Sequence, residues 1–205
     1  EGADIGEYEF VTLVTRYLPN FLYMSKDWLL ENLDEIFDQE NYQKWLCAMQ
    51  GYAHVNRVFE EIYNYLKESK GFLRALDDDN VNQTLNDKIV QNIAVAYLNG
   101  FESLEDENSL IHQLLARKKD SELRQLIWFL WTLRKNGHAK IMDKVFELWP
   151  RILDTIDTNT LEGTRLASNL CDWTAFVDEV NDMNRPLILA VAPYADENHH
   201  SYDLL

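Results

Sequence analysis

Residues 121–154 read SELRQLIWFLWTLRKNGHAKIMDKVFELWPRILD, and this stretch decides the fold. Apolar side chains recur in it three and four residues apart, at Leu123, Leu126, Ile127 and Leu130 and again at Ile141, Val145, Leu148 and Trp149. This spacing is typical of helices that bury one face. Asn136-Gly137 between the two halves is a helix stop signal. The stretch therefore predicts two helices, 122–135 and 138–153, packed face to face across a short turn.

The same periodicity predicts further helices at about 7–18, 25–37, 38–51, 54–76, 81–98, 161–180 and 185–195, with another around 110–115. The one strand-like run, Pro186–Ala192, has no second candidate strand to pair with, so we interpret it as a buried helix. Short loops favour antiparallel neighbours. We predict an all-α fold in which antiparallel helix pairs stack as a short right-handed α-solenoid.

The helix pairs beginning near residues 121 and 161 are separated by about 40 residues, a spacing found in HEAT and armadillo repeats. Residue-level self-similarity between them is lacking, so an irregular helical bundle stays open as the alternative. In either case residues 1–205 are expected to form a single helical array.

Composition excludes several classes of protein. With 205 residues and 46% hydrophobic side chains the chain can bury a core, and 7 Gly and 4 Pro are too few for the turns of a sandwich or barrel. A net charge of −16 argues against binding to nucleic acid, because phosphate contacts need clustered Lys and Arg. It argues equally against docking on an anionic membrane surface.

Cys47 and Cys171 each lie within an apolar helical stretch, where buried free thiols are expected, as in a reducing compartment. The sequence shows neither an apolar run of membrane-spanning length nor a signal peptide, which favours a cytoplasmic location. The first residue is Glu1, and Ser201–Leu205 resembles the start of another amphipathic helix. We therefore expect the chain to be a fragment of a larger protein.

Candidate catalytic and metal-binding motifs are weak. The acidic run 77–80 lacks the Gly and the closing Glu of a calcium loop, so it is interpreted as a solvated linker. Glu197 and His200 form one Glu-x-x-His pair, whereas a di-iron bundle needs two such pairs and two further carboxylates. No nucleophile motif and no Gly-rich phosphate loop occurs. We predict no catalytic, cofactor-binding or metal-binding residue.

The three tryptophans of residues 121–154 could form a stacking platform for a base or a peptide. At helical spacing among leucines, however, tryptophans usually belong to the core. We therefore expect the following side chains to be mostly buried: Trp128, Phe129, Leu130, Phe146 and Trp149.

A basic segment runs against the overall charge. Between residues 117 and 144 there are eight Lys and Arg and only three Asp and Glu, a local net charge of +5. Cations near a helix C-terminus are favourable in any protein. The functional interpretation is a surface that docks an acidic protein partner or another part of the same polypeptide, through Arg117, Lys118, Lys119, Lys140 and Lys144.

Three stretches carry a resemblance: Trp45–Gly51 followed by a long helix, Leu126–Trp131, and Leu148–Leu153. In them the chain resembles the helical C-terminal regions of large bacterial multidomain proteins with sirtuin-like or STAND-type NTPase effector modules. Such regions are similar to degenerate TPR or HEAT arrays and act as sensors or scaffolds. The resemblance implies that any chemistry lies in other domains, and it has no invariant motif from which a functional residue could be transferred.

The leading functional hypothesis is a non-catalytic scaffold, sensor or regulatory region that mediates protein–protein or intramolecular contacts, because solenoids offer extended binding surfaces. Uncovered apolar faces would also allow a weak homodimer. The alternative is a helical-bundle enzyme or a small-ligand-binding domain whose site does not show in residue spacing.

Overall fold

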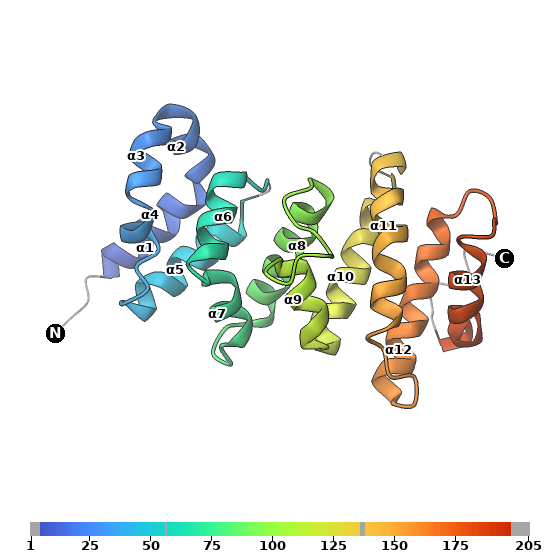
Figure 1. Cartoon of the computed structure of the whole chain (residues 1–205). Helices are drawn as coiled ribbons and strands as arrows, with labels where there is room; N and C mark the ends of the chain where they lie inside the picture. The colour runs from blue at the N-terminus through green and yellow to red at the C-terminus, as the bar shows by residue number, and fades with distance from the viewer. Residues whose placement is uncertain (1–4, 56, 136–137, 198–205) are drawn as a thin grey trace. The chain divides into compact units, whose positions relative to one another are not determined.

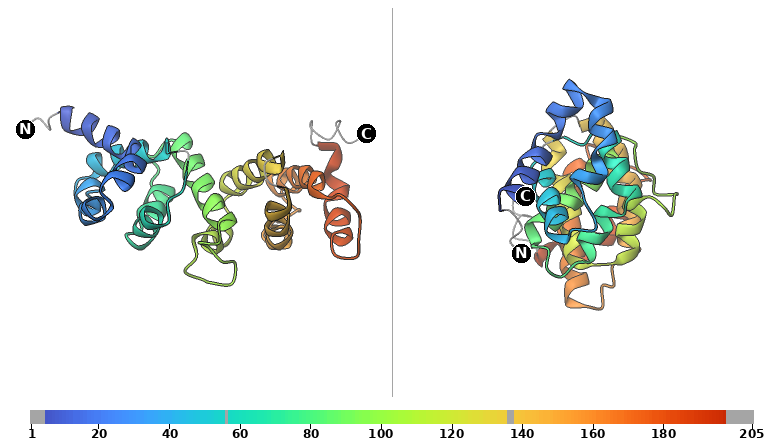
Figure 2. Two further views of the ribbon diagram at one scale, coloured as in Figure 1. Left: turned by 90° about the horizontal axis from the view of Figure 1, so that it is seen from above. Right: turned by 90° about the vertical axis from the view of Figure 1, so that its left-hand side faces the viewer.

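The computed structural model of the chain describes residues 5–55, 57–135 and 138–197, without the side chains of residues 5, 138–140 and 196–197. Throughout these ranges all regular secondary structure is helical (Figure 1). Both further views in Figure 2 show helices and their connecting loops. The prediction of an all-α protein is confirmed.

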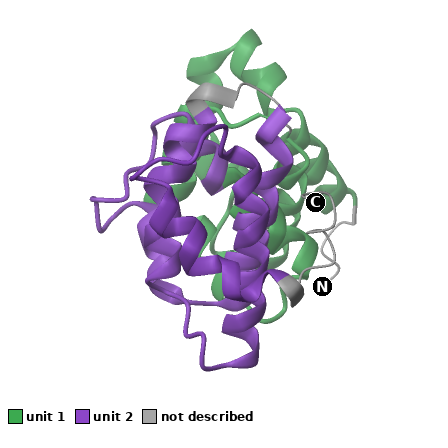
Figure 3. Ribbon diagram, turned by 90° about the vertical axis from the view of Figure 1, so that its right-hand side faces the viewer, with its two compact units in different colours: residues 1–92 green, residues 93–205 purple. Residues whose placement is uncertain are grey.

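The chain divides into two compact units, residues 1–92 and residues 93–205 (Figure 3). Helix α8, Gln83–Leu98, runs without interruption through the point of division. The Asn82 side chain accepts a hydrogen bond from the Leu85 amide at 2.9 Å and so satisfies a free N–H group at the start of α8.

Unit 1 contains seven helices before α8 within its described residues: α1 Ile5–Arg16, α2 Leu18–Met24, α3 Lys26–Glu31, α4 Leu33–Ile36, α5 Tyr42–Ala53, α6 Glu60–Glu68 and α7 Gly71–Asp77. Proline at position 19 lies in the first turn of α2, where its missing N–H costs nothing. The helix expected over 54–76 is divided in two, because Lys70 adopts a left-handed conformation with φ of 59°.

Helix α1 packs on α5 at very close range. A Cβ atom on Gly51 of α5 would lie 2.0 Å from Thr15 Oγ1 and 2.3 Å from the Thr12 carbonyl oxygen of α1. The Thr12 hydroxyl also lies 3.3 Å from the Cys47 carbonyl oxygen of α5. Only glycine at position 51 permits this approach.

The core of unit 1 is aromatic. Phe72 lies between two buried tyrosines, with ring centroids 5.1 Å from Tyr63 and 6.1 Å from Tyr52. The Arg74 guanidinium lies 4.2 Å from the ring centre of the buried Trp45 and donates a hydrogen bond to the Gln39 carbonyl at 2.9 Å. Large aromatic rings that pack against one another supply much of the buried apolar surface.

Unit 2 contains the end of α8 and the following helices: α9 Leu110–Arg117, α10 Asp120–Thr132, η1 Leu133–Lys135, α11 His138–Leu153, α12 Leu161–Leu170, η2 Cys171–Phe176, α13 Arg185–Val191 and η3 Ala192–Glu197. The two helices expected over 122–135 and 138–153 correspond to α10 with η1 and to α11. The strand-like run at 186–192 lies in α13 and η3, so its interpretation as a helix is confirmed. The prediction that this helix is buried is wrong, since Val191 is its one buried residue and Leu189 is 61% exposed. The helix expected to reach residue 180 ends at Leu170 and continues as the 3₁₀ helix η2.

Trp149 and Trp173 form the centre of the unit 2 core. Both are fully buried, and their rings meet edge to face with centroids 5.8 Å apart. The Trp173 indole N–H donates to the Ile127 carbonyl of α10 at 3.0 Å. Burial of Trp149 and Leu130 is confirmed, and Phe129 and Phe146 are half-buried.

The prediction that Trp128 is buried is wrong, since 51% of it is exposed. The buried face of α10 consists of Leu123, Leu126, Ile127 and Leu130, spaced three and four residues apart. Trp128 lies off this face, one turn after the exposed Arg124, so the helix turns it toward solvent.

Candidate functional site

The described residues contain no group of three or more His, Cys, Asp or Glu side chains placed to hold a metal ion. The predicted acidic loop ends α7 and forms a turn in which Asp78 accepts hydrogen bonds from Asn80. His200, together with the side chain of Glu197, lies outside the described residues. None of the helices in the described ranges is long and apolar enough to cross a membrane.

Two buried carboxylates are used within unit 2. Glu102 accepts hydrogen bonds from the Ser109 hydroxyl and from the Ile111 amide, 3.4 Å away, at the start of α9. Glu122, in the first turn of α10, lies 2.9 Å and 3.0 Å from two guanidinium nitrogens of Arg117. Carboxylates at helix N-termini stabilise free N–H groups and the helix dipole, so both have a structural role.

The basic residues of the sequence prediction do not share one environment. The Arg117 guanidinium forms an ion pair with the Glu122 carboxylate, and the Lys119 ammonium also lies 3.7 Å from that carboxylate. Lys144 lies on α11, 2.7 Å from Glu147. The side chain of Lys140 is outside the described residues.

Lys144, Glu147 and Tyr97 form a separate small network. The Tyr97 hydroxyl lies 3.0 Å from both the Lys144 carbonyl oxygen and the Glu147 carboxylate, which share its single O–H donor, and the Lys144 ammonium lies 4.8 Å from the Tyr97 ring centre. Burial, followed by the Glu147 charge, raises the pKa of Tyr97 above its ordinary value. The hydrogen bond from Lys144 lowers the pKa of Glu147. Lys144 therefore already has an acidic neighbour.

Lys118 differs from Arg117, Lys119 and Lys144. It ends α9 in a left-handed conformation with φ of 51°, its side chain is exposed, and within the described part of the chain it forms no ion pair. A positive φ is rare for a residue with a side chain and costs roughly 1 kcal/mol. The turn between α9 and α10 thus presents an unpaired ammonium group at some cost in backbone energy.

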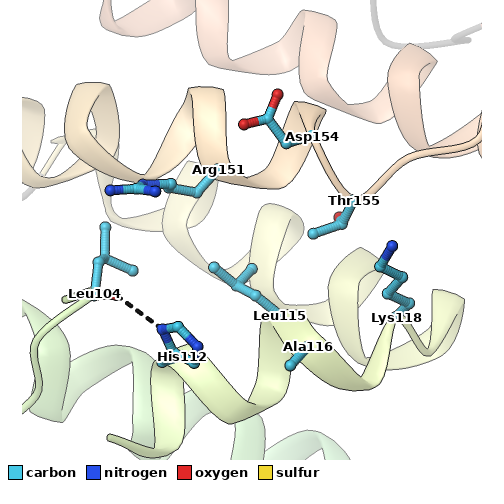
Figure 4. Close-up of a pocket in the computed structure, with 8 residues that line it drawn as sticks. All are labelled: Leu104, His112, Leu115, Ala116, Lys118, Arg151, Asp154 and Thr155. Carbon is cyan, nitrogen blue, oxygen red and sulfur yellow. Dashed lines mark hydrogen bonds between the residues drawn. The ribbon is translucent and has the colours of Figure 1, made fainter. Parts of the chain in front are cut away.

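Lys118 lines a pocket of about 220 Å³ between α9 and α11, which we call the α9–α11 pocket. Its lining residues are Leu104, His112, Leu115, Ala116, Lys118, Arg151, Asp154 and Thr155. Figure 4 shows Arg151 and Lys118 toward opposite ends of the pocket with Leu115 between them, while the Asp154 carboxylate points away from the other labelled side chains. The pocket therefore combines an apolar centre with a cation at each end.

The polar contacts of the α9–α11 pocket fix two of its side chains. His112 Nδ1 lies 2.9 Å from the Leu104 carbonyl oxygen (Figure 4), and since a carbonyl only accepts, Nδ1 is the protonated nitrogen. Arg151 lies at 2.5 Å from the Glu105 carboxylate, and half of its side chain and three quarters of that of Glu105 are exposed. A carboxylate from the 99–109 loop thus already binds the pocket's guanidinium.

Sequence reasoning identified Lys118 but missed Arg151 and His112. Arg151 follows Pro150 near the end of α11, and its charged neighbours in sequence, Glu147 and Asp154, are both acidic, so it belongs to no cluster of cations. Lys118 and Arg151 are far apart in the sequence, and only the packing of α9 and α11 brings them to one pocket. Sequence reasoning therefore did not place them together. The Glu105 partner lies in a loop without any periodic signal.

Comparison of the chain with protein-family models, with curated proteins and with solved structures gives no match. The resemblance to helical regions of large bacterial proteins stays a prediction.

Proposed function

We propose that the chain is a non-catalytic helical scaffold that binds a protein partner, and that the α9–α11 pocket receives an acidic side chain of that partner. The observation that carries this proposal is the Glu105 carboxylate on Arg151. It identifies the ligand chemistry as a carboxylate, the group that a guanidinium binds best.

A carboxylate of the partner can replace Glu105 in its ion pair with Arg151. Exposed ion pairs stabilise a protein by roughly 0–1 kcal/mol, so little is lost when Glu105 leaves. Lys118 adds a second cation, which forms no ion pair with the described residues, and the Asp154 carboxylate of the lining points away from it (Figure 4). A partner segment with two acidic side chains could therefore bind Arg151 and Lys118 together, with its apolar stem against Leu115.

The test uses two synthetic peptides that differ only in carrying Glu or Gln at every charged position, titrated into the isotopically labelled chain. We expect the Glu peptide alone to shift the amide signals of His112, Lys118 and Thr155, and the response to weaken with salt. Glu105→Gln should tighten binding of the Glu peptide, since it releases Arg151. Arg151→Glu should abolish binding.

Lys118→Gly separates binding from folding. The left-handed backbone suits glycine, so the variant should be more stable by up to about 1 kcal/mol while binding the Glu peptide less well. Lys70→Gly is the matched control, because Lys70 has the same conformation in unit 1 and lines no part of the pocket. If Glu105→Gln does not change affinity, or the Gln peptide binds equally, the pocket does not receive a carboxylate.

We also propose that the helices stack as a right-handed solenoid, supported by consecutive helices joined by short loops and by the extended surface that such an array offers a partner. A compact domain of 205 residues has a radius of gyration of about 17 Å. A solenoid should give a clearly larger value in small-angle scattering, and a value near that of a compact domain would favour the bundle.

A further inference from the structure

Helix α1 has two apolar faces. Val11 and Thr15 are buried on one side. On the other side Phe10, Leu13 and Tyr17 are 66%, 54% and 53% exposed, three and four residues apart. Seven of the twelve exposed large hydrophobic side chains of the described residues lie between positions 10 and 30. Exposed apolar side chains are therefore concentrated in this segment of the sequence, and an apolar patch formed by such side chains is a candidate interaction site.

Two of these seven side chains, Phe10 and Trp28, border a hollow in the surface. A cavity of about 380 Å³ lies against α1 to α5 in unit 1, and we call it the α1–α5 groove. Its apolar lining includes Phe10, Val14, Phe21, Trp28 and Ile36. The rings of Phe21 and Trp28 lie 5.9 Å apart, so the groove offers an aromatic wall. A row of apolar side chains from a helix would fit such a groove.

The rim of the groove is acidic. Glu7 and Glu35 line it together with a single cation, Lys44. The Lys44 ammonium is already 3.4 Å from Glu7 and 4.0 Å from Asp38. Glu35, by contrast, is exposed and has no ion-pair partner among the residues that the structure describes. Residues 5–53, which span α1 to α5, carry eight acidic and three basic side chains, a net charge of −5.

Charge decides which occupant fits. A second copy of the chain would bring another net charge of −5 against this segment, and an anionic membrane would be repelled in the same way. We infer that the α1–α5 groove binds an amphipathic helix of a protein partner, one with an apolar stripe flanked by Lys and Arg. The apolar stripe fills the groove against Phe10 and Trp28, and the flanking cations bind Glu35 and its acidic neighbours.

This interaction is independent of the α9–α11 pocket, which lies in the other unit and selects the opposite charge. The test probe is a synthetic helix with leucines at positions i, i+3, i+4 and i+7 and lysines beside them. Its twin carries Glu in place of each Lys. Calorimetric titration uses the full chain with Arg151→Glu, which removes the carboxylate binding proposed for the α9–α11 pocket, and should show binding of the Lys peptide only.

Variants locate the binding surface. Phe10→Ala and Trp28→Ala should each weaken binding at least tenfold while leaving circular dichroism unchanged, because both side chains are largely exposed. Trp128→Ala is the matched control, an equally exposed tryptophan in unit 2. Glu35→Lys should weaken binding at low salt, and the difference should shrink as salt is added.

Three results would overturn the inference. Equal binding of the two peptides would show an unselective apolar surface. Undiminished binding by the Phe10 and Trp28 variants would place the peptide elsewhere. Sedimentation that reveals a dimer dissociated by Phe10→Ala would make a second copy the occupant.

Discussion

Replacing Trp149 by alanine tests the core of unit 2 directly. The side chain is fully buried, its ring lies edge to face with Trp173 at 5.8 Å, and it is stacked with Phe146 at 6.2 Å. Truncation of a buried tryptophan costs about 3–5 kcal/mol through lost burial and the cavity left behind. The Trp149 indole N–H has no hydrogen-bond partner in the described structure, so its removal strands no acceptor. The loss is therefore one of packing.

Urea unfolding followed by circular dichroism measures this loss. With a denaturant slope of about 2 kcal/mol/M, a loss of about 4 kcal/mol lowers the midpoint by about 2 M. Trp128→Ala removes the same side chain from a position that is 51% exposed and should change the free energy of unfolding by no more than about 0.5 kcal/mol. A Trp149 variant that loses less than about 1 kcal/mol, or as little as the Trp128 variant, would refute this account of the core.

Four further results are expected. Gly51→Ala should lower the melting temperature, although alanine has the better helix propensity, because the new Cβ would lie 2.0 Å from Thr15 Oγ1. An unchanged melting temperature would show that α1 can shift freely. Tyr97→Phe should destabilise by roughly 1–3 kcal/mol in urea unfolding, because it removes the O–H donor that the Lys144 carbonyl and Glu147 share. Tyr52→Phe should be neutral or stabilising, because that buried hydroxyl has no partner in the described structure. Burial raises the pKa of Cys171 to about 11, so about one in a thousand of these thiols is ionised at pH 8. A thiol reagent should therefore label Cys171 only after the protein unfolds, and rapid labelling of the native protein would contradict its burial.

Periodicity predicted the helices well because it reports which face of a segment is buried. It also identified Trp149 and Leu130 as core residues. Periodicity gave the wrong burial for Trp128, because tryptophan is treated as apolar at every position around a helix. The position of Trp128 around α10 places it outside the buried stripe. It also extended the helix at 161 to residue 180, since composition does not reveal the change to a 3₁₀ helix at Cys171.

The candidate sites were less accessible to sequence reasoning. A cluster of cations in sequence suggested one docking surface, yet Arg117 and Lys144 have acidic partners that only tertiary packing supplies. The α1–α5 groove was missed for a different reason. Phe10 and Leu13 match a helical stripe, and a pattern of apolar residues cannot distinguish a stripe covered by the chain itself from one left exposed.

The continuity of α8 matters for anyone who dissects the chain. The division between the units falls after Asn92, in the middle of a helix that supplies buried Leu85 to one unit and buried Tyr97 to the other. Cutting there would leave two short helical stubs, each of which must nucleate alone at high entropic cost. A truncation after Gly100, where φ of 83° ends the helix, keeps α8 whole on the N-terminal piece. The C-terminal piece then lacks the buried Tyr97. No single cut therefore leaves both units with all of their core residues, and the chain should be expressed in one piece.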